Sequence, residues 1–262
     1  IADAFDADQG VAVDRDHFYA VDNSTITKHD RRTGEPVAQF AGDSTVFQHF
    51  DSGAIIRGRL YAAHSNYPKW PMTSSIEILD PRTMRHIGTH SFGIDRGSMT
   101  WIDYHDGYWW GGFANYDKIQ RGMTQPYGET RNTQVVQMDH NFQVVQAWTI
   151  PQGILERFSP MSNSGGSWGP DGRLYLTGHD ASEAYVMELP EAGSELRWVA
   201  TIALPDIEGQ GIAWDRSDPR HPTLWGVSRQ GGQVVQFDVP YQKIPDRTEP
   251  TWQVLGPGAF QD

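Results

Sequence analysis

Apolar and polar positions alternate along this chain in short stretches, and five of these stretches follow one pattern. Each begins with a glycine or serine three residues before an apolar position, then passes through a polar turn to an apolar or aromatic pair. The first is residues 10–13 (GVAV) with Phe18 and Tyr19, and the last is residues 211–214 (GIAW) with Leu224 and Trp225. The starts lie at positions 10, 53, 98, 165 and 211. Such nearly regular spacing indicates a repeat architecture.

Each unit continues with two more alternating stretches, and a period of two residues is typical of β-strands. The third stretches are residues 26–30, 76–80, 135–139, 186–190 and 234–238, and the fourth are residues 36–40, 86–90, 144–148, 198–202 and 252–255. Turn-forming residues such as Asp30 to Gly34 separate the third stretch from the fourth. Four short antiparallel strands in a unit of roughly 45 residues are typical of a β-propeller blade.

We therefore expect an all-β fold, a five-bladed β-propeller with four antiparallel strands per blade. It would form a single domain over residues 1–262, with blades at about 9–42, 51–92, 97–150, 163–204 and 209–256. The repeated glycine would let the innermost strands approach closely at the axis. Residues 1–5 would add an edge strand that helps to close the ring. The alternative is two unrelated β-domains that share turn chemistry.

Two stretches resemble repeats of known propellers. Residues 10–22 (GVAVDRDHFYAVD) resemble the NHL-type repeat, and residues 208–214 (EGQGIAW) resemble the start of blades in the senescence-marker and gluconolactonase group. This resemblance implies a propeller superfamily and no specific family or activity.

The charge and composition of the chain exclude several classes of function. The formal net charge is −12, which disfavours binding to nucleic acid or to anionic membranes. The absence of cysteine excludes disulfides, thiolate metal sites and a cysteine nucleophile. No apolar run is long enough to span a bilayer. The start at Ile1 suggests either a removed signal peptide, which would favour the periplasm or secretion, or an arbitrary boundary. The compartment and the oligomeric state stay open.

In propellers, the loops before the first strand and after the second strand of each blade surround one mouth of the central channel, where we expect the site. His64 and His179 end equivalent second strands and are candidate general bases, although each could simply bind a loop carbonyl. Glu208 or Asp180 would orient a histidine or hold a cation. The candidate substrate-binding residues are Asn115, Arg229, Trp70, Tyr67, Asn163 and Asp22.

A divalent cation such as calcium is a candidate cofactor, because Glu208, Asn163 and Asp22 offer oxygen ligands. No local spacing motif supports a metal site, so no metal ligand is assigned. Two loops interrupt the repeat, residues 65–72 with Tyr67 and Trp70, and residues 116–133. The longer loop is either a functional lid or a surface elaboration.

These features favour an enzyme acting on a small or medium polar organic molecule in the channel mouth. The chemistry would be lactone or ester hydrolysis (a hydrolase) or lyase-type acid–base catalysis, because acid and base groups are present without a nucleophile-elbow signature. The main alternative is a non-catalytic propeller that binds a protein or a carbohydrate through its aromatic loops. A glycosidase with two carboxylates is a third hypothesis. In each case the expected ligand is a small molecule, a saccharide or a protein.

Overall fold

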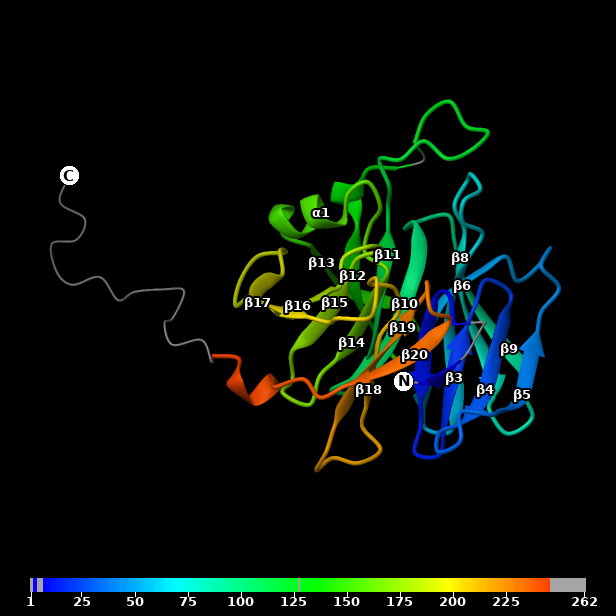
Figure 1. The fold of residues 1–262 in the computed structure, drawn as a ribbon. Helices are drawn as coiled ribbons and strands as arrows, with labels where there is room; N and C mark the ends of the chain where they lie inside the picture. The colour runs from blue at the N-terminus through cyan, green and yellow to red at the C-terminus, as the bar shows by residue number, and fades with distance from the viewer. Residues whose placement is uncertain (1, 4–6, 127, 246–262) are drawn as a thin grey trace, which may run out of the picture.

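Five four-stranded antiparallel sheets form the molecule (Figure 1), which is a five-bladed β-propeller. The structure, a computed structural model, describes residues 2–3, 7–126 and 128–245. The innermost strand of each sheet contacts the innermost strands of its two neighbours, in the cyclic order β2, β6, β10, β14, β18 and back to β2. The fold expected from the repeated pattern is therefore confirmed.

The strands follow one another from the axis outward in each of the first four sheets. They are β2 (Gly10–Val13), β3 (His17–Val21), β4 (Thr25–Asp30) and β5 (Pro36–Ala41); β6 (His49–Ile56), β7 (Arg59–Ser65), β8 (Ser74–Asp80) and β9 (Arg85–Gly93); β10 (Ser98–His105), β11 (Tyr108–Ala114), β12 (Gln134–Met138) and β13 (Val144–Thr149); and β14 (Gly165–Trp168), β15 (Leu174–Thr177), β16 (Glu183–Glu188) and β17 (Arg197–Ala203).

The fifth sheet combines both ends of the described chain. Its inner three strands are β18 (Ala213–Asp215), β19 (Thr223–Ser228) and β20 (Gln233–Phe237), and its outermost strand is β1 (Ala2–Asp3). Ala2 pairs with Val234 and Asp3 with Gln233. The expected edge strand near the N-terminus is thus present and closes the ring. Residues 252–255, which the sequence predicts as the fourth strand of this sheet, lie outside the described residues.

Burial falls from the axis outward. All four residues of β14 are buried, whereas exposed and partly exposed residues alternate along β9. Inner strands are covered on both faces by the neighbouring sheets, so most of their residues are buried. The outermost strands pack mainly through alternate side chains, most regularly in β9.

The repeated glycines lie where the inner strands meet. A Cβ on Gly10 would lie 2.5 Å from the Asp51 carbonyl oxygen, and one on Gly211 would lie 2.5 Å from Ser52 Cβ. Such distances leave no room for a side chain. The backbone N–H of Gly211 donates to the Gln9 carbonyl oxygen over 2.9 Å, which joins the first inner strand to the last. Residues 9–14 (QGVAVD) and residues 210–215 (QGIAWD), which are nearly identical in sequence, meet at this junction.

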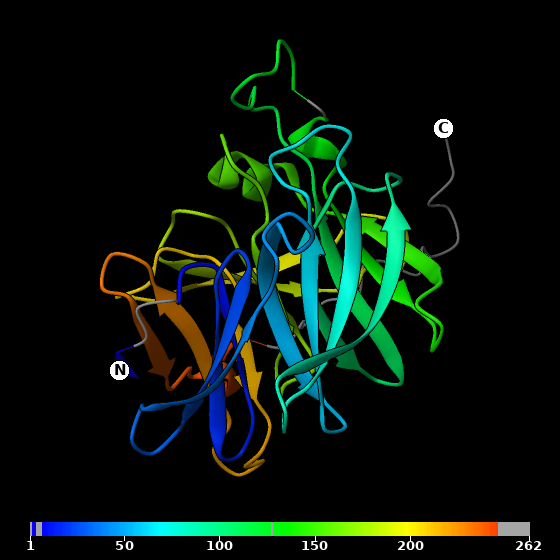
Figure 2. The ribbon, with the colours of Figure 1, turned by 90° about the vertical axis from the view of Figure 1, so that its right-hand side faces the viewer.

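Two insertions rise from the same end of the propeller (Figure 2). One is the segment between β11 and β12, which contains the short helix η1 (Thr130–Asn132), and the other contains helix α1 (Gln152–Phe158) between β13 and β14. A second short helix, η2 (Tyr241–Lys243), follows β20. The sequence analysis did not predict α1, whose residues Ile154, Leu155 and Phe158 are buried in the core between the third and fourth sheets.

The α-helical content is too small for a membrane span. Helix α1 has 7 residues, and no helix in the described part of the chain is long and apolar enough to cross a bilayer.

The far end of the axis is filled by charged groups. Arg216 donates from Nη1 to Asp103 Oδ1 over 3.0 Å, and its Nη2 donates to the Trp168 carbonyl oxygen over 2.6 Å. Arg216 and Asp103 border a void of only about 30 Å³. The insertions lie at the opposite end of the axis.

Candidate functional site

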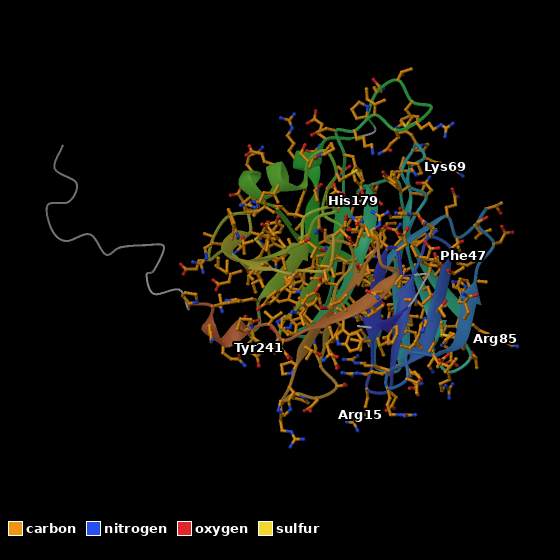
Figure 3. All side chains as sticks on the ribbon, in the orientation of Figure 1. Arg15, Phe47, Lys69, Arg85, His179 and Tyr241 are labelled. Atoms are coloured by element: carbon orange, nitrogen blue, oxygen red, sulfur yellow. The ribbon has the colours of Figure 1, made fainter. Side chains whose placement is uncertain are left out.

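A cavity of about 390 Å³ lies at the end of the axis where the inner strands begin. Its walls come from the segments before the first strands and the loops after the second strands, as expected for a propeller. Figure 3 shows His179 toward this end, on the same side as Lys69, while Arg15 lies at the opposite end. The charged or titratable side chains that line it most directly are Asp8, His49, Asp51, His179 and Arg229.

His179 lines the cavity in a fixed orientation. Its Nδ1 lies 2.6 Å from Asp180 Oδ1, and its Nε2 lies 3.3 Å from Arg229 Nη1. A guanidinium can only donate, so Nε2 accepts and the ring proton is on Nδ1, which donates to Asp180. The structure therefore brings together three of the residues predicted from the sequence. Asp180 itself is mostly exposed and does not line the cavity.

Arg229 connects this histidine to two further carboxylates. Its Nε donates to Asp8 Oδ1 over 3.1 Å, and its backbone N–H donates to Glu208 Oε2 over 2.9 Å. Glu208 does not line the cavity but fixes the backbone of the loop after β19. Glu208 is therefore a positioning residue for Arg229.

His64 lies in a different environment from His179. It is buried within the second sheet, where its Nε2 accepts from the Gln48 backbone N–H over 3.0 Å and its Nδ1 contacts Ser75 Oγ at 2.9 Å. Ser75 in turn donates to Glu77 Oε1 over 2.6 Å. Burial lowers the pKa of His64 to about 4, with the charge of Glu77 acting in the opposite direction. His64 does not line the cavity and is not in contact with His179.

His49 lines the cavity and was missed by the sequence analysis. Its Nδ1 lies 2.6 Å from Asn23 Oδ1, and its Nε2 lies 3.4 Å from Asp51 Oδ1. Burial acts against protonation of His49, but the negative charge of Asp51, with smaller contributions from Asp22 and Asp8, outweighs it and raises the pKa. The sequence contains a signal that could have pointed to His49, because this residue stands two positions before Asp51 at the start of an inner strand.

Asp51 is almost fully enclosed, with 4% of the residue exposed. Burial raises the pKa of its carboxyl, although His49 and His179 both favour the ionised form. Its Oδ2 accepts no hydrogen bond from the described residues. Asp51 occupies a bulge where the pairing between β6 and β7 skips from Phe50 to Gly53. The bulge directs this side chain away from the regular ladder.

An aromatic wall completes the cavity. The ring of Tyr67 lies 5.0 Å from that of His49 and 5.2 Å from that of Tyr116. The Tyr67 hydroxyl donates to Gln120 Oε1 over 3.4 Å, which connects the two loops that interrupt the repeat. Trp70, predicted as a ligand-stacking residue, is 64% exposed on the first of these loops and does not line the cavity.

The other three predicted binding residues have structural partners and do not line the cavity. Asn163 is buried, accepts from Trp101 Nε1 over 2.7 Å and donates to two carbonyl oxygens. Asn115 donates to the carbonyl oxygens of Arg96 and Asn132 and so shapes the loop after β11. Asp22 accepts from the side chain of Asn23 over 2.9 Å and thereby orients the partner of His49.

The residues considered as cation ligands are not grouped as a metal would require. Glu208, Asn163 and Asp22 each have their own partners, as described above. Within the described residues, no three His, Asp or Glu side chains are placed to hold a metal ion together.

Comparison with known proteins gives no family. No protein-family model matches the chain, and no curated protein sequence matches it. Among solved structures it is similar to the PQQ-bound aldose sugar dehydrogenase from Streptomyces coelicolor, at 14% identity over 90% of this chain and 83% of that chain, with a TM-score of 0.49. Virginiamycin B lyase from Staphylococcus aureus is 12% identical over 91% of this chain and 73% of its own, with a TM-score of 0.46. The WD40 β-propeller domain of Doa1 is 13% identical over 86% of this chain and 76% of its own, with a TM-score of 0.43. These similarities concern the fold alone.

Proposed function

We propose that this protein is an enzyme that performs acid–base chemistry on a small or medium polar organic molecule in the cavity. The reaction class is hydrolysis of a lactone or ester, or proton abstraction of the lyase type. The observation that carries the proposal is that two histidines, His49 and His179, line one cavity and each is paired with a carboxylate. Histidine is the usual side chain for proton transfer near neutral pH.

The two histidines differ in the way that acid–base catalysis needs. The lone pair of His179 Nε2 faces the cavity side of Arg229, while Asp180 holds the opposite nitrogen. A substrate that draws Arg229 toward a developing negative charge frees Nε2 to take a proton. His49 is favoured in its protonated form by Asp51, so it serves as the proton donor.

The dimensions and lining of the cavity fit a small ligand. Its volume of about 390 Å³ lies in the range of small-molecule sites, roughly 300–1,000 Å³. Side-chain amides of Gln9, Gln48 and Gln210 supply neutral hydrogen-bonding groups on its wall. Such groups suit a polar molecule or a saccharide unit, which is the ligand class that we assign to it.

A screen of lactones, esters and uronic-acid oligomers tests this proposal. His179→Gln and His49→Gln should each lower kcat on any substrate found by about 10² to 10⁴-fold, the usual contribution of a general acid or base. His221→Gln is the matched control, because His221 is exposed on the loop between β18 and β19 and does not line the cavity. Full activity in both cavity variants, or binding without turnover across the screen, would contradict the proposal.

A second function is favoured by exposed apolar side chains on the two interrupting loops. Trp70 is 64% and Ile119 55% exposed, and the Tyr67–Gln120 contact joins their loops. Aromatic residues displayed in this way are common in surfaces that bind carbohydrates or proteins. In that case Trp70→Ala would abolish retention on a glycan array while His179→Gln would leave it unchanged. The reverse pattern would exclude this alternative.

A further inference from the structure

Two buried side-chain oxygen atoms of residues that line the cavity accept no hydrogen bond from the described residues. They are Asp51 Oδ2 and Gln48 Oε1, and both residues line the cavity. The amide nitrogen of Gln48 donates to the Thr45 carbonyl oxygen over 3.3 Å, which sets the orientation of its side chain. A buried acceptor without a partner costs about 1–3 kcal/mol, and more when it is charged. A ligand that supplies donors would recover this energy.

Several donors of the wall are, in contrast, already engaged. Arg229 donates to Asp8 and to His179, and His49 Nδ1 donates to Asn23. An anionic ligand could use the Nε donor of Arg229 only after displacing Asp8. A ligand that brings N–H groups meets free acceptors instead. Because the unsatisfied atoms are both hydrogen-bond acceptors, they favour a ligand that is rich in hydrogen-bond donors.

The remaining surroundings favour positive charge on that ligand. Asp8 lies at the cavity with a side chain that is 42% exposed, and Asp22 lies close enough to act on His49. The rings of Tyr67 and Tyr116 form one wall, and the faces of tyrosine rings attract cations. The net charge of −12 also draws cations toward the molecule.

We infer that the cavity binds a small polar molecule through a primary ammonium group, which donates to Asp51 Oδ2 and Gln48 Oε1 beside the Tyr67 and Tyr116 rings. This inference rests on the proposed function, since it names the ligand class of the same cavity. An ammonium group has three donors and one positive charge, so it satisfies both free acceptors and compensates the buried carboxylate. His49 keeps its contact with the other oxygen of Asp51.

Calorimetric binding with matched amine and alcohol pairs tests the inference without any need for turnover. The probes are glucosamine and glucose, 2-amino-1,3-propanediol and glycerol, and glucuronate as the anion, all at neutral pH. We expect at least one amine to bind about tenfold more tightly than its alcohol partner, because a hydrogen bond to a charged group contributes about 1.5–3 kcal/mol. Glucuronate should bind more weakly than glucosamine. Equal affinity within both pairs, or preference for glucuronate, would overturn the inference.

Variants separate the local site from the general negative charge. Asp51→Asn should remove the preference for amines, whereas Asp16→Asn, which makes the same change in net charge on an exposed turn residue, should keep it. Gln48→Leu should weaken amine binding and covers the case in which Asp51→Asn does not fold. Amine preference that survives both Asp51→Asn and Gln48→Leu would sink the assignment. Amine binding without turnover would contradict only the proposed enzyme, and turnover of neutral lactones without amine preference would contradict only this inference.

Discussion

His49 Nδ1 lies 2.6 Å from the side-chain oxygen of Asn23, although 25 residues separate them and they belong to different sheets. Asn23 is itself held by Asp22, and the second nitrogen of His49 faces Asp51. The side chains thus form a chain of contacts from the loop after β3 to the bulge in β6. This chain fixes the ring of His49 at the cavity wall.

Asn23→Ala should release His49 while leaving it in the cavity. The short contact gives the ring N–H a strongly downfield proton NMR signal, which should disappear in Asn23→Ala and equally in His49→Gln. The loss of a single hydrogen bond should lower the free energy of unfolding by about 1 kcal/mol. Asn141→Ala is the control, because Asn141 is an exposed turn residue in the third sheet. A downfield signal that persists in Asn23→Ala would show that another residue holds the ring.

His64 should make the protein less stable in acid. The folded-state pKa of His64 is about 4, which lies below the usual 6.5. At pH values between these two, the unfolded chain binds more protons than the folded protein, so the free energy of unfolding rises with pH. The shift in the pKa of His64 corresponds to a change of about 3 kcal/mol in the free energy of unfolding. Urea unfolding of the wild type and of His64→Gln across this pH range measures it, and the dependence should be flatter in the variant.

His49 supplies a contrast of opposite sign. Its folded-state pKa is raised, so its contribution to stability is present at pH values below the usual histidine pKa and is lost as the pH rises through the raised value. His49→Gln should therefore make stability rise more steeply with pH, while His64→Gln makes it rise less. The same direction of change in both variants would contradict the two environments described above.

Gly211→Ala should destabilise the ring strongly. The added Cβ would lie 2.5 Å from Ser52 Cβ and 2.9 Å from Gly10 Cα, so the inner strands would have to separate. We expect a loss of roughly 1–3 kcal/mol or more from overpacking, measured by thermal or urea unfolding. Gly88→Ala on the outer strand β9 is the matched control, since its Cβ would meet only Ile78, at ordinary contact distance. It should be close to neutral.

Arg216→Ala should remove the counter-charge of the buried Asp103 at the far end of the axis. Asp103 is 3% exposed and bonds to Arg216 through both carboxylate oxygens. An uncompensated buried carboxylate costs about 3–5 kcal/mol, so the free energy of unfolding should fall by an amount of this order. The exposed pair of Arg82 with Asp80 gives the comparison, because Arg82→Ala should cost less than about 1 kcal/mol. Similar losses for both variants would contradict the assignment of Asp103 as buried and dependent on its partner.

The repeat made the propeller predictable, because the same crowding at the axis selects a similar sequence in each inner strand. Gly10 and Gly211 are visible in the sequence, each followed by an apolar run. Both glycines have one physical cause, the close approach of the inner strands. Helix α1 was not predicted, since it has only 7 residues and begins at Gln152 and Gly153, with no capping residue to announce it. Its helical form depends on contacts with the core that no local pattern encodes.

The two histidines show why the site was harder to predict. His64 and His179 follow the same apolar pattern, but β7 continues to Ser65 whereas β15 ends at Thr177. His64 is therefore paired within the sheet, opposite Phe50 and Ser75, while His179 lies beyond the last pair and is free to turn toward the cavity. A difference of a few residues in strand length decides which side chain reaches the cavity, and this difference depends on tertiary contacts.

The pairing of β1 with β20 also sets an order on folding during synthesis. Among the described strands, β1 is synthesised before all the others, and its partner, Gln233–Phe237, is synthesised after all the others. Until then the circle has an opening at which two sheets expose their apolar sides. The ring therefore stays open, with apolar side chains uncovered at the gap, until residues 233–237 have been synthesised.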